Sequence, residues 1–450
     1  MKKRLIVKER TPLCLDCIGE IIEYLYCCKT FFRVAIVNRR VWDHIENEYP
    51  RCAKNIEFIF SYPLKKFTPF VFNASLSFHV KDKTDFSLFS NVERLSSLLG
   101  DSNINLQLSH CKNLKFLELD CISELTDEGL FHLRCIETLD VVEDNITNIG
   151  LSYIPNIKNL FLFGGENITN CGLRYLSNVN SLTLGKNENI TNVGLLWFKS
   201  IEHLILPLCS EISNEGLKYI SGVKTLKLES THLIDNNGLK FLKGVERLYL
   251  GKCLGISNSG LEFIKGLKSL SLLTAGIINN DGLQFLTGIK NLELRFWVNI
   301  NDIGLKYIAG AESLHLRYNI NITDNGLKFF PNIKVLDLSS NQNITDKGLK
   351  YIPNVISLYI SLASNISDDG LKHLHCLEYI EFLDNKNITN ETLMGLKRLK
   401  RMKVKLINRA VDVIKKYKNF ICYGSINTDY EHRLGQVFIY QFVKKINKQL

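Results

Sequence analysis

Hydrophobic and polar positions along most of this chain follow a pattern that repeats every 22 residues. A Gly-Leu pair marks each copy; the first two pairs are 21 residues apart and the later ones 22 residues apart. A thirteenth copy has Thr392-Leu393 in place of Gly-Leu. The glycines are Gly129, Gly150, Gly172, Gly194, Gly216, Gly238, Gly260, Gly282, Gly304, Gly326, Gly348 and Gly370. Self-similarity at a short fixed period predicts a repeat architecture.

One copy, residues 333–352, shows what each unit predicts. Leu336 and Leu338 alternate with other residues at the period of a half-buried strand, and Leu349 and Ile352 then follow at helical spacing. Three positions before each Gly-Leu pair the sequence has Thr, Ser, Asp or Asn, the residue types that cap helix N-termini. These predicted caps are Thr126, Thr147, Thr169, Thr191, Ser213, Asp235, Ser257, Asn279, Asn301, Thr323, Thr345, Ser367 and Thr389.

A 22-residue unit cannot bury its apolar side alone, so we expect the copies to stack into an α/β solenoid, with strands on the concave side and helices on the convex side. The Ile-Thr-Asp-x-Gly-Leu signature resembles the leucine-rich repeat, in the subtype with Cys or Asn at the turn. The resemblance covers residues 111–404 and implies about 13 repeats of 22 residues. The turn position holds Asn187, Cys209, Cys253, Asn319, Asn341 and Asn385, whereas Trp297 and Ala275 depart from the pattern.

Residues 1–50 have a different pattern. Apolar residues between Leu15 and Leu25 form a helical stripe, and residues 31–42 end in a basic pair followed by Trp42. We therefore expect a small module of two or three short helices. So small a module cannot build a sufficient core by itself, and a partner or the repeats must complete it.

This N-terminal module resembles an F-box. Leu13, Asp16, Ile21, Ile22, Leu25, Val37, Arg39 and Arg40 match the family pattern in order, whereas Cys14 replaces proline and Val41 replaces tryptophan. Followed by such repeats, it resembles F-box/leucine-rich-repeat proteins, the substrate receptors of cullin-type ubiquitin ligases, similar to those that amoeba-infecting giant DNA viruses encode. The resemblance implies a Skp-type adaptor as partner, bound through Leu13, Ile18, Ile21, Ile22, Leu25, Val37 and Arg40.

Two other segments complete the expected organisation. Residues 51–110 are read as a linker with a degenerate first repeat at Val92-x-x-Leu95, and residues 405–450 as a basic C-terminal cap. The net charge is +10, and most of it lies in residues 397–418, which hold ten basic residues and one acid. Such charges protect the exposed edge of a last repeat. Contact with a polyanion is the less favoured alternative, so nucleic acid is not the expected partner.

Catalysis finds little support in the sequence. The histidines are scattered, and no phosphate-binding glycine loop or nucleophile elbow is present, so we expect a non-enzymatic protein without a cofactor or metal. Cys14-x-x-Cys17 could suggest zinc, but small buried thiols are the favoured interpretation. Thirteen cysteines, no secretory segment and no apolar run of about 18 residues predict reduced thiols, a cytoplasmic location and no membrane partner.

Candidate binding residues lie at outward-facing positions of the predicted strands. The expected substrate-binding set on the concave face is Arg247, Tyr249, Glu293, Arg295, His315, Arg317 and Tyr359, and Tyr379 and Glu381 are further positions of the same face. Arg295, His315 and Arg317 bring positive charge together on this face, and Glu293 and Asp337 flank them. We therefore expect a protein partner that presents carboxylates or phosphates beside hydrogen-bond donors. The function expected is an adaptor that holds a protein for ubiquitin transfer. The alternatives are a scaffold without a ligase link and a polyanion-binding repeat protein.

Overall fold

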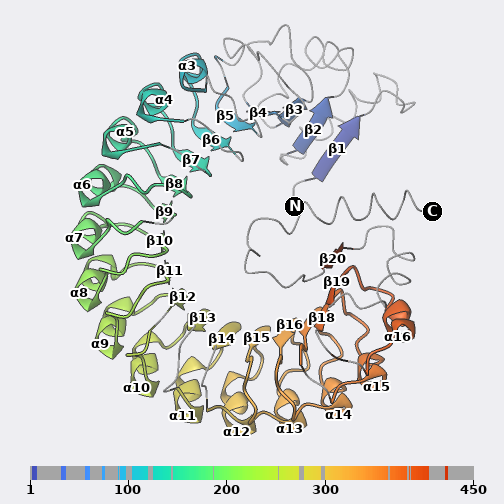
Figure 1. Ribbon diagram of the computed structural model, residues 1–450. Coiled ribbons are helices and arrows are strands. Elements are labelled where there is room, and N and C mark those ends of the chain that lie inside the picture. The colour runs from blue at the N-terminus through green and yellow to red at the C-terminus, as the bar shows by residue number, and fades with distance from the viewer. Residues whose placement is uncertain are drawn as a thin grey trace. The chain divides into compact units, whose positions relative to one another are not determined.

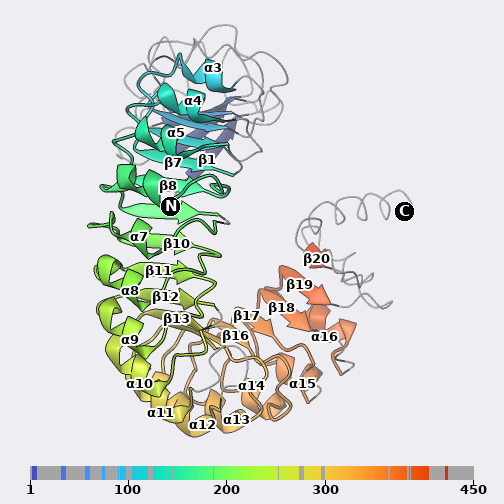
Figure 2. The ribbon, with the colours of Figure 1, turned by 60° about the vertical axis from the view of Figure 1, so that its left-hand side comes forward.

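The computed structural model of this 450-residue chain divides into two compact units, Met1–Glu229 (unit 1) and Ser230–Leu450 (unit 2). The residues that it describes are 3–7, 32–36, 56–60, 73–76, 90, 92–97, 104–119, 125–142, 145–185, 187–251, 253–272, 278–294, 299–362, 365–382, 385, 387–404 and 421–423. In each unit the strands form a row along the inner side and the short helices lie along the outer side (Figure 1, Figure 2).

Unit 1 has parallel strands that follow one another in chain order from β1 to β11. The strands are β1 (Lys3–Val7), β2 (Phe32–Ile36), β3 (Ile56–Phe60), β4 (Asn73–Leu76), β5 (Arg94–Ser97), β6 (Phe116–Leu119), β7 (Thr138–Val141), β8 (Asn159–Leu162), β9 (Ser181–Leu184), β10 (His203–Leu206) and β11 (Thr225–Leu228). The helices are α3 (Ile104–Leu108), α4 (Asp127–Phe131), α5 (Asn148–Ser152), α6 (Asn170–Leu173), α7 (Asn192–Leu195) and α8 (Asn214–Leu217), with 3₁₀ turns η3 (Arg174–Leu176) and η4 (Lys218–Ile220).

Unit 2 repeats the same plan. Its strands are β12 (Arg247–Leu250), β13 (Ser269–Leu272), β14 (Asn291–Leu294), β15 (Ser313–His315), β16 (Val335–Asp337), β17 (Ser357–Tyr359), β18 (Tyr379–Phe382), β19 (Arg401–Val404) and β20 (Ile421–Tyr423). Its helices are α9 (Asn236–Leu239), α10 (Asn258–Leu261), α11 (Asn280–Leu283), α12 (Asp302–Leu305), α13 (Asp324–Leu327), α14 (Asp346–Leu349), α15 (Asp368–Leu371) and α16 (Asn390–Gly395). The 3₁₀ turns are η5 (Lys240–Leu242), η6 (Glu262–Ile264), η7 (Gln284–Leu286) and η8 (Lys306–Ile308).

The core lies between the strand row and the helix row of each unit. In unit 2, Leu292, Leu314 and Leu336 pair in register on neighbouring strands, and each is at most 1% exposed. The leucine that follows each repeat glycine is buried as well; Leu283 and Leu349, for example, are both 0% exposed. The predicted α/β solenoid of 22-residue repeats is therefore confirmed for the repeats that the structure describes.

Neighbouring copies are joined at the helix N-termini by a hydrogen-bonded contact that we name the corner bridge. In it, a carboxylate or amide at the first helical residue of one copy accepts the N–H of the cap residue in the next copy. Asp302 Oδ1 accepts the Thr323 N–H at 2.8 Å, and Asp302 Oδ2 accepts the Thr323 hydroxyl at 2.6 Å. In the copy before, Asn280 Oδ1 accepts the Asn301 N–H at 3.0 Å. Each corner bridge satisfies a helix-end N–H that has no partner inside its own helix.

The repeat glycine makes room for this bridge. A Cβ atom built on Gly326 would lie 2.5 Å from Asp302 Oδ1 and 2.8 Å from Leu305 Cδ1, closer than real Cβ atoms approach such neighbours. The glycine is therefore required by the close approach of the preceding copy.

The predicted caps also accept hydrogen bonds within their own copies, with one exception. Thr323 Oγ1, for instance, accepts the Asn325 N–H at 3.3 Å. Ser257 makes no such cap bond; its hydroxyl meets Asn236 Nδ2 at 2.7 Å, as other caps meet the preceding copy, and also lies 3.1 Å from Ser259 Oγ.

The N-terminal region differs from the expected helical module where the structure describes it. Residues 32–36, assigned to that module from the sequence, form strand β2, which pairs in parallel with β1 and β3. Phe, Val and Ile in this segment favour an extended chain over a helix. In the expected linker, β3 and β4 continue the ladder to β5, where Val92 and Leu95 are both 0% exposed.

Candidate functional site

The inner face of unit 2 carries a line of side chains at the position between two buried apolar residues of each strand. Strand register aligns these side chains one above another, and we name the line the middle row. Its members are Tyr249, Ser271, Glu293, His315, Asp337, Tyr359 and Glu381. Neighbouring strands are about 4.8 Å apart, so side chains on successive strands can touch.

Asp337 is the central charge of the middle row and is only 8% exposed. Its Oδ1 accepts the Ser339 N–H at 2.9 Å. Its Oδ2 lies 3.7 Å from Arg317 Nε and 4.0 Å from His315 Nδ1. Arg317 and His315 therefore face a carboxylate of their own chain, which offsets the positive charge that the sequence led us to expect here.

Aromatic rings continue this cluster along the row. The His315 and Tyr359 ring centroids are 6.0 Å apart, and those of Tyr359 and Tyr379 are 5.2 Å apart. The Arg401 guanidinium lies 5.6 Å from the Tyr379 ring centroid, and the Tyr379 hydroxyl donates to Glu381 Oε2 at 3.1 Å. Aromatic and arginine side chains held together in this way are the residue types that dominate binding energy at protein interfaces.

The hydroxyl of Tyr359 remains protonated over the physiological pH range. Partial burial raises the pKa of Tyr359, and the carboxylates of Glu381 and Asp337 raise it further, while Arg401 acts in the opposite direction. The group is thus a hydrogen-bond donor placed between two acidic side chains of neighbouring strands.

The other residues of the predicted substrate-binding set lie at different places. Glu293 accepts the Ser271 hydroxyl at 2.6 Å on the same row. Arg247 and Tyr249 belong to β12, three strands before His315. Arg295 lies outside the described residues. The structure therefore joins His315, Arg317 and Tyr359 in one cluster and leaves Arg247 and Tyr249 apart from it.

Sequence reasoning left Asp337, Tyr379, Glu381 and Arg401 out of that set, although the first three were placed on the inner face. Their position in the repeat could have identified them, because Asp337 and Glu381 occupy the same repeat position as His315 and Tyr359 in the neighbouring copies. Asp337 was expected to flank the cations, but its ion pair with Arg317 was not predicted.

The predicted adaptor-binding residues all lie outside the described residues. They are Leu13, Ile18, Ile21, Ile22, Leu25, Val37 and Arg40, and the same holds for Cys14 and Cys17.

Metal and thiol chemistry can be assessed for the part of the chain that the structure describes. There, no group of three or more His, Cys, Asp or Glu side chains could hold a metal ion, and no helix is long and apolar enough to cross a membrane. Burial raises the pKa of the Cys111 and Cys209 thiols to about 12, so both stay protonated and unreactive.

Comparison with known protein families identifies one copy of the repeat. Residues 331–352 match a family model described as a leucine-rich repeat. No curated protein matches the chain. Among solved structures, the yeast Rad7–Elc1 complex aligns at 15% identity and a TM-score of 0.42, over 72% of this chain and 87% of that chain. An internalin from Listeria monocytogenes aligns at 19% identity and a TM-score of 0.39, over 73% of this chain and 85% of that chain. The Toll–Spätzle complex of Drosophila aligns at 12% identity and a TM-score of 0.34, over 94% of this chain and 55% of that chain.

Proposed function

We propose that this chain, a leucine-rich-repeat protein, is a non-enzymatic scaffold that binds a protein partner on the inner face of unit 2. The observation that carries the proposal is the cluster of His315, Arg317, Asp337, Tyr359 and Tyr379. These side chains are partly exposed, except for the largely buried Asp337, and they contact one another across four strands. The solenoid needs only the buried leucines on these strands, so the fold itself does not account for this combination of aromatic and charged groups.

The mutual contacts also bear on how a partner would bind. Side chains that already contact one another lose less conformational entropy on binding than free ones do. A protein surface that meets Tyr359 and Tyr379 would bury aromatic area and could accept a hydrogen bond from the Tyr359 hydroxyl. Because Asp337 offsets Arg317 and His315, the partner need not be strongly acidic.

The test is to purify the tagged protein with bound partners and to compare two double variants. Arg317→Ala plus Tyr359→Ala should lose the retained protein, because truncating a central anchor costs about 2 kcal/mol or more, roughly thirtyfold in affinity. Lys306→Ala plus Lys328→Ala on the helix side is the matched control and should retain it. Equal melting temperatures show that folding is unchanged. Equal retention by the two variants would contradict the proposal.

We further propose that residues 1–50 attach this scaffold to the Skp-type adaptor of a cullin ubiquitin ligase, in the cytoplasm, or in the host cytoplasm if the protein is viral. The support is the order of Leu13, Asp16, Ile21, Ile22 and Leu25, which resembles an F-box. Strand β2, inside the matched segment, departs from a helical module, so the proposal rests on residues 13–25.

Changing Ile21 and Leu25 to Asp together should abolish adaptor binding, because two charges would enter an apolar contact. The repeats should keep their melting temperature. If the wild-type protein captures no Skp-type subunit in cells, the ligase link is wrong and the scaffold remains.

A further inference from the structure

The last copy of the repeat differs from all earlier copies at two positions on its helix side. Thr392 stands where the others have glycine, and Gly395 stands where they have an aromatic residue or histidine. The corresponding residues of unit 2 are Phe241, Phe263, Phe285, Tyr307, Phe329, Tyr351 and His373.

The first difference alters how α16 meets α15. Thr392 carries the Cβ atom that earlier copies exclude to let neighbouring helices approach. In α16 the cap Thr389 accepts the N–H of the third helical residue, Thr392, at 3.4 Å, whereas earlier caps such as Thr323 accept that of the second residue. The corner bridge persists, because Asp368 accepts the Thr389 N–H at 2.7 Å and its hydroxyl at 2.8 Å. The helix begins at the usual corner but departs from the usual geometry beyond it.

The second difference removes a ring that covers the junction between earlier copies. At two of these junctions a lysine of one copy lies near the aromatic ring of the next: Lys240 Nζ is 5.4 Å from the Phe263 ring centroid, and Lys328 Nζ is 5.2 Å from that of Tyr351. In the last copy the equivalent pair is Lys372 and Gly395. A Cβ atom built on Gly395 would meet nothing within 4 Å, so the space that a ring would occupy is open.

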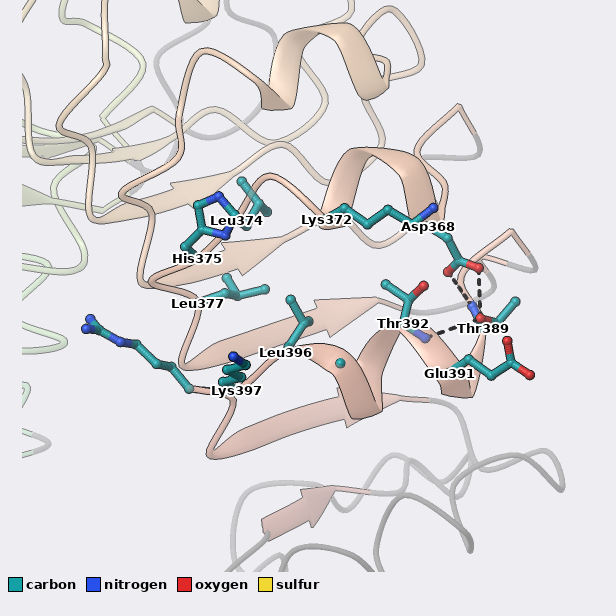
Figure 3. Close-up of a pocket in the computed structure, with 12 residues that line it drawn as sticks. Asp368, Lys372, Leu374, His375, Leu377, Thr389, Glu391, Thr392, Leu396 and Lys397 are labelled. Atoms are coloured by element: carbon teal, nitrogen blue, oxygen red, sulfur yellow. Dashed lines mark hydrogen bonds between the residues drawn. The ribbon is translucent and has the colours of Figure 1, made fainter.

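These two differences coincide with a hollow of about 570 Å³ between the last two repeats, within the usual size range of ligand sites. Leu374, Leu377 and Leu396 lie along one side of the hollow (Figure 3). Lys372 lies above them, and Asp368 and Thr389 lie together at the opposite end. Leu396 is 8% exposed, and Leu374 and Leu377 behind it are 1% exposed, so the floor of the hollow is apolar and its ends are polar.

The charged groups around the hollow favour an anionic neighbour. Lys372, Lys397 and Arg398 line it, together with two carboxylates, Asp368 and Glu391. Lys372 is already paired with Asp369, since its Nζ lies 2.6 Å from Asp369 Oδ1, so the attraction for an anion comes from Lys397 and Arg398. Both oxygens of Asp368 are already engaged by Thr389, and Lys397 and Arg398 are exposed. Carboxylates approaching this rim would form charge-assisted hydrogen bonds with the lysine and the guanidinium.

We propose that this hollow is a second docking site, which takes an aromatic side chain from an acidic segment of a partner protein. The inserted ring occupies the space that an aromatic residue of the chain covers in earlier copies and lies near Lys372, as Phe263 lies near Lys240. Carboxylates on either side of the ring pair with Lys397 and Arg398. The site lies on the helix side, and its occupant is independent of the partner on the inner face.

The experiment measures the fluorescence anisotropy of a labelled peptide, Asp-Asp-Phe-Asp-Asp, titrated with the full-length protein. Gly395→Phe restores the missing ring from within the chain and should weaken peptide binding at least tenfold. Gly222→Phe is the matched control, because a Cβ there also meets nothing within 4 Å, and it should bind the peptide as the wild type does. A peptide with alanine in place of phenylalanine should bind at least tenfold more weakly.

Three results would overturn the proposal: no binding by the wild-type protein, unchanged binding by a folded Gly395→Phe variant, or equal binding of the alanine peptide. Melting curves establish whether Gly395→Phe is folded. If that variant is unfolded, the double variant Lys397→Ala plus Arg398→Ala is the deciding test. A loss of peptide affinity of at least fivefold supports the site, and unchanged peptide affinity refutes it.

Discussion

The helix-side corners and the middle row of unit 2 belong to the same repeats but differ in how much they vary. At the corners, successive copies present an Asp or Asn oxygen to the cap N–H of the next copy, as Asn280 does to Asn301 and Asp302 does to Thr323. Along the middle row, neighbouring copies present Glu293, His315, Asp337 and Tyr359 in turn.

The difference follows from what each position must satisfy. A corner residue supports both its own helix and the next copy, so its choice is limited to side chains that accept a hydrogen bond in a narrow space. A middle-row residue lies outside the leucine core and can vary without loss of stacking. Variation there is thus available for partner recognition, and corner substitutions should affect stability whereas middle-row substitutions should affect binding.

The largest expected effect lies beneath both regions, in the shared core. Leu283→Asp should unfold unit 2, because a charge would replace a side chain that is 0% exposed, at a cost of several kcal/mol. Urea titration followed by circular dichroism measures the loss. An unchanged transition would contradict the register of the repeat.

A smaller effect is expected at the corner glycine. Gly326→Ala places a Cβ against Asp302 Oδ1 and Leu305 Cδ1, and such overpacking should lower the free energy of unfolding by about 2 kcal/mol. Alanine's better helix propensity, worth about 1 kcal/mol, offsets part of that cost. The exposed Gly222→Ala, which meets nothing within 4 Å, is the control and should not destabilise. Equal stability of the two variants would show that the corner tolerates a Cβ.

The corner bridge itself should contribute less. Asp302→Ala removes the acceptor of the Thr323 N–H and hydroxyl and should cost about 1 kcal/mol. Asp302→Asn should be nearly neutral, because Asn280 forms the equivalent bridge one copy earlier and donates from Nδ2 to Asn301 Oδ1 at 2.8 Å. Chemical denaturation of both variants measures the difference. If the Asn variant lost as much as the Ala variant, the carboxylate charge would be the stabilising feature.

The structural features that lie within a single repeat could be predicted from the sequence, whereas contacts between neighbouring repeats were missed. Strand leucines and cap residues such as Thr323 are readable from one 22-residue unit, because period and residue type are local signals. The acceptor role of Asp302 required knowing which cap lies beside it in the next copy. The pairing of Arg317 with Asp337 was missed for the same reason, since the two belong to neighbouring copies of the repeat. Strand β2 lies outside the period, and its residues were assigned to a helical module because they follow the helical stripe of residues 15–25.

Surface ion pairs along one edge of the repeats provide the weakest link between copies. Lys158 Nζ lies 2.8 Å from Glu137, Lys224 Nζ lies 2.7 Å from Glu202, and Lys334 contacts Glu312. In each case the hydrogen bond from the lysine, followed by its charge, lowers the pKa of the carboxyl below its ordinary value of 4.5. The side chains are about half exposed, so water and salt screen the attraction.

These pairs predict a small acid-dependent loss of stability. A carboxyl whose pKa is lower in the folded chain stabilises it fully above the unfolded pKa, and the contribution disappears as the pH falls through the folded pKa. The window therefore begins near pH 4.5 and extends below it. Replacing Glu137, Glu202 and Glu312 with Gln should reduce the difference in free energy of unfolding between pH 6 and pH 3, and 0.5 M NaCl should bring wild type and variant closer together. Urea titrations at the two pH values measure this difference. An identical acid response of both proteins at low salt would show that the edge pairs add nothing to the cohesion of the repeats, leaving the corner bridges and the leucine core to hold neighbouring copies together.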